Sequence, residues 1–183
     1  MGIKIDAKWH IVFTKPRREK KVVELLEKKK IESYCPQNKV SSALTNHKVV
    51  SVQLLFPSYV FVRISEDQVN EVLRTSGVIN FMYWLKTPAI VPDRDIEMVK
   101  YFLSEYENLQ VERTEVKVSE ASSIIRGTLV SKTGNMPSHC VQAVLPSLGF
   151  VLISEADSFI DTHQPNNNTF YKTTEQVIIK EQF

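Results

Sequence analysis

The alternation of apolar and polar positions divides the first hundred residues into strands and short amphipathic helices. Residues 9–14 combine aromatic and β-branched side chains, which is typical of a strand. Pro16 then suits the first turn of a helix, and residues 17–30 carry apolar side chains at helical spacing among Lys and Glu. The pattern predicts a helix with one stripe packed on a sheet and a basic outer face.

The next segment predicts three more strands. Residues 31–36 read as a short strand, and residues 37–53 as a hairpin with its loop around residues 41–46. The run at residues 54–64 is the strongest strand prediction in the chain. Its alternation separates two sets of side chains: Val60, Val62 and Ile64 on one face, and Tyr59, Phe61 and Arg63 on the other.

Two more helices are expected, at residues 66–75 with Ser65 as N-cap and at residues 93–107. A strand at residues 78–85 and a turn at Thr87-Pro88 separate them. The resulting order of elements is that of a split βαβ module, in which helices pack on an antiparallel sheet. The sequence therefore predicts an α+β fold for this half of the chain.

The second half has a different pattern. Short β-rich stretches alternate with glycine-containing turns, which is typical of a small β-barrel. The predicted strands lie at residues 116–118, 128–131, 140–144, 150–153 and 177–180, with an exposed loop at 164–168. We accordingly expect an N-terminal domain at residues 1–107, a polar linker at 108–114 and a barrel with a long tail at 115–183.

The amino-acid composition agrees with the predicted two-domain fold. Of 183 residues, 43% are hydrophobic and 24% charged, which is ordinary for a soluble globular protein. We expect no signal peptide and no membrane span, because apolar runs are only a few residues long. A cytoplasmic monomer is also expected. Cys35 and Cys140 lie far apart and form neither a zinc signature nor a disulfide framework, so two reduced thiols are expected.

The charge is unevenly distributed along the chain, although its net value is only +2. Residues 1–48 carry twelve Lys or Arg and five Asp or Glu, whereas residues 49–115 carry six and ten. A basic first quarter suggests a face directed at a polyanion. A solvated helix face explains the same charges equally well.

No catalytic or cofactor-binding pattern is present. The four histidines are scattered, and the Walker, GxSxG and GxGxxG patterns are absent. We therefore expect no enzyme, no cofactor and no metal site. Two features suggest binding instead: cations at the start of the first helix, and an aromatic strand. The cations are Lys15, Arg17, Arg18, Lys20 and Lys21.

The aromatic strand has two interpretations. Tyr59 and Phe61 could be core residues, but Val60 and Val62 already offer an apolar face to the helices, which would leave the aromatics exposed. An exposed aromatic face can bind a protein or stack nucleic-acid bases. The glycine-rich octamer of an RRM is absent, so a protein partner is favoured.

At this point the motifs resemble those of NusG transcription elongation factors, in particular specialised paralogs of the RfaH and UpxY kind. The resemblance covers about 90 residues in three ordered blocks. The first block is Trp9-His10-Ile11-Val12-Phe13-Thr14-Lys15-Pro16-Arg17. The second is Leu55-Phe56-Pro57-Ser58-Tyr59-Val60-Phe61-Val62, which is similar to the family signature FPGYVFV. The third is Ser76-Gly77-Val78 followed by Thr87-Pro88-Ala89-Ile90-Val91-Pro92. The second half is similar to the family's KOW domain, an SH3-like barrel, although Glu120-Ala121-Ser122 replaces a usual glycine.

The resemblance implies an operon-specific antitermination factor that sits on RNA polymerase. An apolar patch would dock on the clamp helices of the largest subunit, and it would comprise Phe56, Tyr59, Phe61, Phe81 and Trp84. Residues expected towards the non-template DNA are Lys15, Arg17, Arg18, Lys21, Arg74 and Thr75. The 37–53 hairpin would approach upstream DNA, and the KOW domain would reach a ribosomal protein or a termination factor. The alternatives are a housekeeping elongation factor and an RNA-binding protein that never meets polymerase.

Overall fold

The fold is taken from a computed structural model that describes residues 7–44, 47–84, 86–117, 120–130, 138–155 and 176–179. It divides the chain into two compact units. The N-terminal unit comprises Met1–Pro36 and Leu54–Ile96, and the C-terminal unit comprises Gln37–Gln53 and Glu97–Phe183. Within the described residues, no helix is long and apolar enough to cross a membrane.

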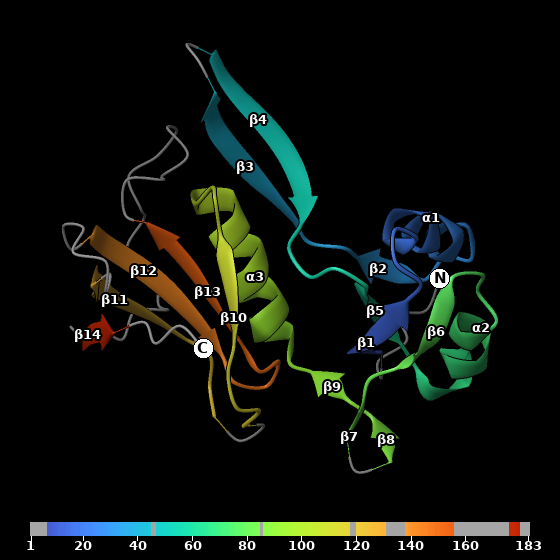
Figure 1. Cartoon of the computed structure of the whole chain (residues 1–183). Coiled ribbons are helices and arrows are strands. Elements are labelled where there is room, and N and C mark those ends of the chain that lie inside the picture. The colour runs from blue at the N-terminus through green and yellow to red at the C-terminus, as the bar shows by residue number, and fades with distance from the viewer. Residues whose placement is uncertain are drawn as a thin grey trace. The chain divides into compact units, whose positions relative to one another are not determined.

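The N-terminal unit is built on an antiparallel sheet in the order β2-β5-β1-β6, with β9 also paired to β1 (Figure 1). Its strands are β1 (Lys8–Thr14), β2 (Glu32–Tyr34), β5 (Tyr59–Ile64), β6 (Val78–Phe81) and β9 (Ile90–Val91). A small ribbon of β7 (Tyr83–Trp84) and β8 (Thr87–Pro88) follows β6. Thr87-Pro88, expected as a turn, is therefore a strand of this ribbon.

Two helices cover one face of this sheet. They are α1 (Glu19–Lys28) and the short α2 (Val69–Leu73), which continues the 3-10 turn η1 (Glu66–Gln68). Val22 and Leu26 of α1 and Val72 of α2 are fully buried against the sheet, as the spacing of apolar residues predicted. Ser65 caps η1, because its side chain and that of Gln68 each pair with the other's backbone in a capping box. The predicted N-cap is confirmed.

The C-terminal unit contains most of α3 (Asp93–Glu105) and two further sheets. The ribbon of β3 (Gln37–Leu44) and β4 (His47–Leu54) confirms the predicted hairpin, and its strands extend through most of the expected loop. The larger sheet has the order β10-β13-β12-β11-β14 (Figure 1). Its strands are β10 (Gln110–Arg113), β11 (Ser123–Val130), β12 (Ser138–Leu145), β13 (Phe150–Glu155) and β14 (Gln176–Ile179).

The C-terminal sheet differs from the expected pattern in two places. The polar segment at residues 108–114 contains β10, which pairs with β13 along its length, and Val116 and Lys117 are not in a strand. Polar side chains suit β10 because most of it is exposed. Within the described residues this sheet is an open path from β10 to β14, so barrel closure stays a prediction, as does the domain boundary at 108–114. The loop expected at 164–168 lies outside the described residues.

Candidate functional site

The two faces of β5 have the residues that the alternation predicted. β5 pairs antiparallel with β1, so that Val12 lies opposite Val60 and Ile11 opposite Phe61. Residues opposite one another share a face of the sheet. Val60 and Val62 accordingly lie in the core beneath α1 and α2, together with Ile64. The prediction for this face is confirmed.

The other face carries five rings that we call the aromatic face: Phe13, Tyr34, Phe56, Tyr59 and Phe61. Ring centroids are 5.2 Å apart for Phe13 and Tyr59, 6.0 Å for Phe56 and Phe61, and 6.3 Å for Tyr34 and Phe61. The expectation of an open patch is wrong for two of them, because Phe61 is only 1% exposed and Phe56 only 3%. Tyr59 and Phe13 are partly exposed. The aromatic face is thus a packed layer with an accessible margin.

The structure separates the remaining two aromatic residues expected in the patch. Phe81 lies opposite Val12 on the helix side of the sheet and belongs to the core cluster. Its expected place beside Phe61 is therefore wrong, because the alternation along β6 puts it on the opposite face. Trp84 on β7 is 47% exposed. It is available for a partner, whereas Phe81 is a structural residue.

The turn before β5 is held by the first residue of α1. Ser58 has φ of +66°, a left-handed conformation that a residue other than glycine adopts at a cost. Its backbone N–H donates to Oε1 of Glu19 at 2.8 Å, and Thr14 N–H donates to Ser58 O at 2.9 Å. Glu19 is itself buried. The pattern of Lys and Glu along residues 17–30 does not indicate this role, which only the long-range contact shows.

Glu19 also lies close to a thiol. Burial, followed by the negative charge of Glu19, raises the pKa of Cys35 to about 11, and Lys20 opposes this shift. The Cys35 thiol lies 4.0 Å from the carbonyl oxygen of Tyr59. At neutral pH such a thiol is protonated and a weak nucleophile. Its chemistry is that of a small apolar side chain, and it packs against the helix-side core.

The predicted cations come together where α1 begins and α2 ends. Lys15, Arg17, Arg18 and Arg74 are all exposed, and we call these four residues the basic rim. Lys15 N–H donates to Gly77 O at 2.8 Å, and Arg18 packs against Gly77, whose φ is +99°. The two segments are therefore adjacent although nearly 60 residues separate them. Because the cations crowd the positive end of the α1 dipole, they favour an anionic ligand.

Lys21 and Thr75, which were also expected to face DNA, do not belong to the basic rim. Lys21 is exposed but forms an ion pair with Glu24 at 2.9 Å, which compensates its charge. Thr75 is buried and was expected to face DNA. Its hydroxyl donates to Glu71 O at 3.0 Å and accepts from Lys29 Nζ at 2.8 Å. Thr75 thus ties α2 to the end of α1, a link between residues 46 positions apart that no local pattern could reveal.

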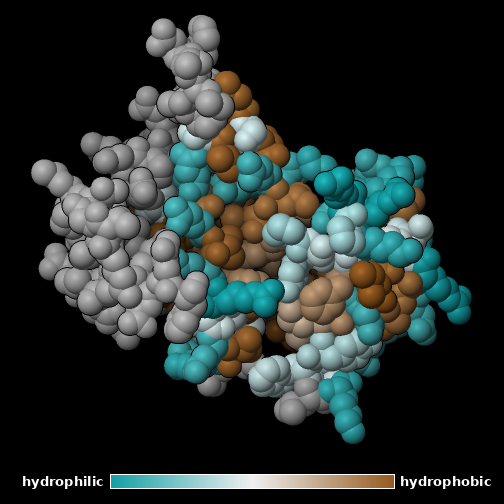
Figure 2. All heavy atoms as spheres, in the orientation of Figure 1, coloured by the Kyte–Doolittle hydropathy of each residue, from teal (hydrophilic) through white to brown (hydrophobic). Residues whose placement is uncertain are grey.

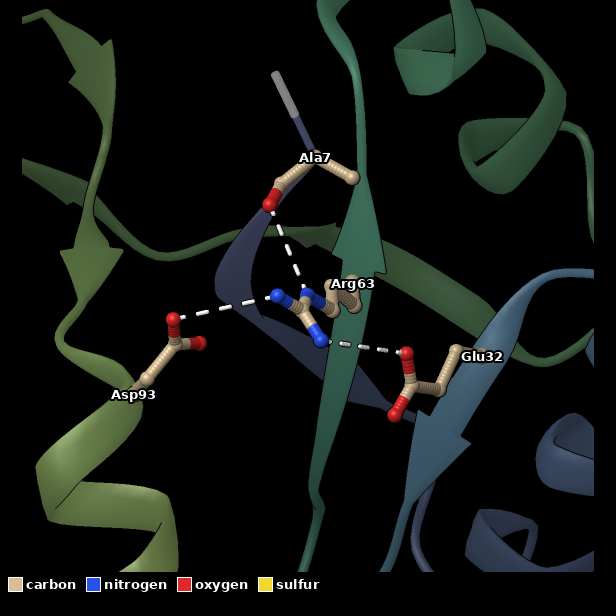
Figure 3. Close-up of polar contacts among 4 residues, drawn as sticks. All are labelled: Ala7, Glu32, Arg63 and Asp93. Carbon is tan, nitrogen blue, oxygen red and sulfur yellow. Dashed lines mark hydrogen bonds and ion pairs between the residues drawn. The ribbon is translucent and has the colours of Figure 1, made fainter. Parts of the chain in front are cut away.

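Arg63 is a further residue that sequence reasoning did not single out as more than a strand position. Its guanidinium contacts Glu32 of β2 at 3.7 Å and Asp93, the first residue of α3, at 3.8 Å, and its Nε donates to Ala7 O at 3.5 Å. Figure 3 shows Arg63 between the two carboxylates. These partners are well exposed, so each ion pair contributes at most about 1 kcal/mol. The charge of Arg63 is matched within the fold.

An open pocket of about 1060 Å³ lies on the N-terminal unit between β1, η1 and the β7–β8 ribbon. It is lined by Lys8, His10, Ile64, Ser65, Glu66, Asp67, Val69, Asn70, Tyr83, Thr87, Pro88 and Ile90. His10 is held by a 3.0 Å contact of Nδ1 with Ala89 O, and burial lowers its pKa. Within the described residues, no group of three or more potential ligands could hold a metal ion.

Comparison with known proteins gives one family. Residues 7–100 match the family described as transcription termination factor nusG. A solved structure, described as "Domain interaction in Thermotoga maritima NusG", is 21% identical to this chain. The match covers 82% of this chain and 93% of that one, with a TM-score of 0.47. No curated protein matches.

Proposed function

We propose that this chain, which belongs to the NusG family of transcription factors, acts in transcript elongation and antitermination by binding RNA polymerase. The observation that carries the proposal is the family match over residues 7–100, which spans β1 to the middle of α3. Both binding features of the N-terminal unit, the aromatic face and the basic rim, fall inside this range. The function is one of binding, in which no covalent bond is made or broken.

The polymerase contact is assigned to the accessible margin of the aromatic face and to Trp84. Tyr59 and Trp84 can contribute exposed aromatic area, and such residues dominate binding energy at protein interfaces. Phe56 and Phe61 are buried, so they are assigned to the packing of this face rather than to contact with the partner. The resemblance at Leu55–Val62 favours the clamp helices of the largest polymerase subunit as the partner segment.

The basic rim is assigned to the non-template DNA strand. Lys15, Arg18 and Arg74 are exposed cations on adjacent segments, and they can neutralise neighbouring phosphates without reading sequence. Thr75 contributes by holding α2 in place. A factor that binds both the clamp and DNA bridges the polymerase cleft, which would hold the clamp closed and suppress pausing and termination.

The C-terminal sheet is assigned to a KOW-like barrel that recruits a ribosomal protein or a termination factor. Its antiparallel core of β10, β13, β12 and β11, with β14 added in parallel, supports a small all-β domain. We further propose the specialised, operon-specific type, on the Pro88-Ala89-Ile90-Val91-Pro92 block. A specialised factor would act only on templates that carry a recruitment element.

The test is retention of purified core RNA polymerase by the full-length protein. Tyr59→Ala and Trp84→Ala should each weaken retention, and the pair should abolish it, while circular dichroism stays unchanged. Ile79→Ala is the matched control, because Ile79 is an apolar residue on β6 that is 59% exposed. Polymerase retention by the double variant equal to that of Ile79→Ala would refute the assignment.

A second experiment separates the specialised type from a general elongation factor. Transcription through a pause and a terminator is measured with and without the protein, on templates with and without the native operon leader. A leader-dependent effect supports the specialised type, and an equal effect on both templates makes the chain a general elongation factor. If the protein binds RNA but never changes elongation, the transcription proposal fails.

A further inference from the structure

The β3–β4 ribbon has two outer edges, because β3 and β4 pair with each other and, within the described residues, with no third strand (Figure 1). The N–H and C=O groups along such an edge form a template on which a further strand can add. An edge is open to a partner only where these groups point outward and nothing else covers them. The two edges of this ribbon differ in that respect.

The outer edge of β3 is covered by the segment that follows α3. Asn108 N–H donates to Lys39 O at 2.8 Å, and Asn108 Oδ1 accepts from Ser41 N–H at 2.7 Å. Asn38, which is buried, donates to Leu109 O at 2.9 Å and accepts from Leu109 N–H at 3.2 Å. These bonds anchor the base of the ribbon and occupy groups through which β3 would pair with another strand.

The backbone groups on the outer edge of β4 follow from its contacts with β3. Leu55 N–H donates to Pro36 O at 2.9 Å, and Ser51 Oγ donates to Val40 O at 3.3 Å. Both contacts fit one antiparallel register, in which Leu55 and every second residue before it direct their N–H groups towards β3. That register also places the bonds from β3 to Asn108 on its outer edge. The outward N–H and C=O groups of β4 are therefore those of Lys48, Val50, Val52 and Leu54.

The side chains along this edge are apolar and exposed. Val49, Val50 and Val52 are 51%, 51% and 55% exposed, and in Figure 2 hydrophobic residues are visible on the ribbon at the top of the view. Residues 49–54 contain neither a charged residue nor a proline, the two features that commonly keep an edge strand from pairing. The outer edge of β4 thus has the composition of a paired strand, although no strand of the described residues pairs with it.

We propose that the outer edge of β4 binds the same edge of a second copy of this chain, with the two strands antiparallel and Ser51 opposite its own copy. This register is centred on residues 48–54, so each outward group meets one of the partner. Val50 then lies opposite the partner's Val52. Because side chains alternate along a strand, the valines at positions 50 and 52 of both copies share one face of the joined sheet.

Charge and geometry favour a second copy as the occupant. Lys48 would lie opposite the partner's Leu54, so no like charges meet across the edge. Because the edge of β3 is covered, association closes at two copies and does not continue into a fibre. An edge of one strand is smaller than a standard interface, so we expect association at concentrations on the order of tens of micromolar. The monomer expected from the sequence would then hold only at lower concentration, and the proposal does not depend on polymerase binding.

The first test follows the mass of the full-length protein by sedimentation velocity from about 1 µM to about 200 µM, a range that covers weak association. We expect a shift from monomer to dimer and no larger species. Ser51→Lys and Ser51→Glu each place like charges directly opposite one another across the twofold axis. Each variant alone should therefore raise the dissociation constant about fivefold or more.

A one-to-one mixture of the two Ser51 variants provides the rescue. Lysine then faces glutamate, so the mixture should associate at least as tightly as the unmodified protein. Both variants lose the Ser51 bond to Val40, so recovery in the mixture cannot come from that bond. Gln53→Lys is the matched control, because position 53 shares a face of β4 with Ser51 but lies opposite the partner's Val49. It should dimerise nearly as well as the unmodified protein.

Hydrogen exchange at single amides tests the register itself. The N–H groups of Val50 and Val52 point outward, so their exchange should slow as the protein concentration rises. Ser51 N–H points towards β3, so its exchange rate should not depend on protein concentration. Circular dichroism at low concentration shows whether each variant is folded before its association is compared.

Four outcomes contradict the proposal. The protein could stay monomeric over the whole concentration range, or the mixture of Ser51 variants could associate no better than either variant alone. Concentration-dependent protection at Ser51 in place of Val50 and Val52 would exclude this register. Species larger than a dimer would show that a second edge is open. Protection of Val50 and Val52 that appears only after polymerase is added would make the edge a polymerase contact instead of a contact between copies.

Discussion

Replacing Glu19 tests whether one buried carboxylate organises the turn that leads into the aromatic strand. Glu19→Ala removes the acceptor that Ser58 N–H meets at 2.8 Å, in a site where Glu19 is only 3% exposed. A partly buried donor without a partner costs about 1–3 kcal/mol, and bonds to charged groups lie at the upper end. We expect Glu19→Ala to lower the free energy of unfolding by about 2–3 kcal/mol.

Glu19→Gln separates the hydrogen bond from the charge. The amide oxygen can still accept from Ser58, and a neutral bond is roughly half as strong as a charge-assisted one, so a loss of about 1 kcal/mol is expected. Ser58→Gly is the companion variant. It relieves the left-handed backbone, worth about 1–2 kcal/mol, against an entropic cost of about 0.5–1 kcal/mol, so it should be neutral or slightly stabilising.

The effect of Glu19→Gln can also be measured at the Cys35 thiol. Burial is the first cause of its raised pKa of about 11, and the Glu19 charge is the second. Glu19→Gln removes the charge and leaves burial, so the pKa should fall but remain above its ordinary value. Lys20→Gln should shift the pKa upwards, because Lys20 stabilises the thiolate. The alkylation rate is followed against pH in a Cys140→Ser background.

Urea unfolding and thiol titration together test whether Glu19 holds the turn at Ser58 and lies beside Cys35. If Glu19→Ala and Glu19→Gln both unfold at the urea concentration of the unmodified protein, the Ser58 contact does not hold the turn. If Cys35 then titrates unchanged in Glu19→Gln, the carboxylate is also not beside the thiol. The first result would remove the link between the start of α1 and the turn before β5, and the second would remove the link between Glu19 and Cys35.

Four further predictions concern stability. Gly77→Ala places a methyl group 2.9 Å from Val22 in a left-handed backbone, so thermal unfolding should show a loss of about 1–3 kcal/mol. Burial raises the pKa of Cys35 to about 11 and that of Tyr34 to about 12. Their contribution to stability should therefore be full below pH 9 and be lost as pH rises through 11 to 12. The double variant Cys35→Ala with Tyr34→Phe should reduce this decline, measured as the urea midpoint against pH. Burial lowers the pKa of His10, so stability should be full above pH 6.5 and fall in acid, and His10→Gln should remove that dependence. Asn38→Ala should cost about 1–3 kcal/mol and speed hydrogen exchange at the base of the ribbon more than in β1.

The elements of the N-terminal unit could be predicted because local signals agree there. Apolar residues at helical spacing gave α1 its buried stripe, and strict alternation gave β5 its two faces. Ser65 with Gln68 is a capping box that lies within four residues of sequence. Each of these features depends on neighbours along the chain, so a single sequence contains them.

Which faces and side chains become buried in the tertiary structure could not be predicted in the same way. Alternation shows that Phe61 and Val62 point in opposite directions, but it does not show whether the second face is covered, and Phe61 is buried. The partners of Glu19 and Thr75 lie 39 and 46 residues away along the chain. Such contacts depend on how the strands and helices are placed in space. For the same reason the polar stretch containing β10 was expected to be a linker.

The burial of Phe61 changes which variant of the aromatic strand is informative. Truncating a fully buried phenylalanine costs about 3–5 kcal/mol, a large part of the total stability of a small domain. A variant that combines Tyr59→Ala with Phe61→Ala would therefore lose polymerase through partial unfolding even if neither ring touched it. Tyr59→Ala alone removes a partly exposed ring that pairs with Phe13, so its effect on retention reports contact. The exposed edge of the aromatic strand, rather than its most buried ring, is where binding and folding can be measured apart.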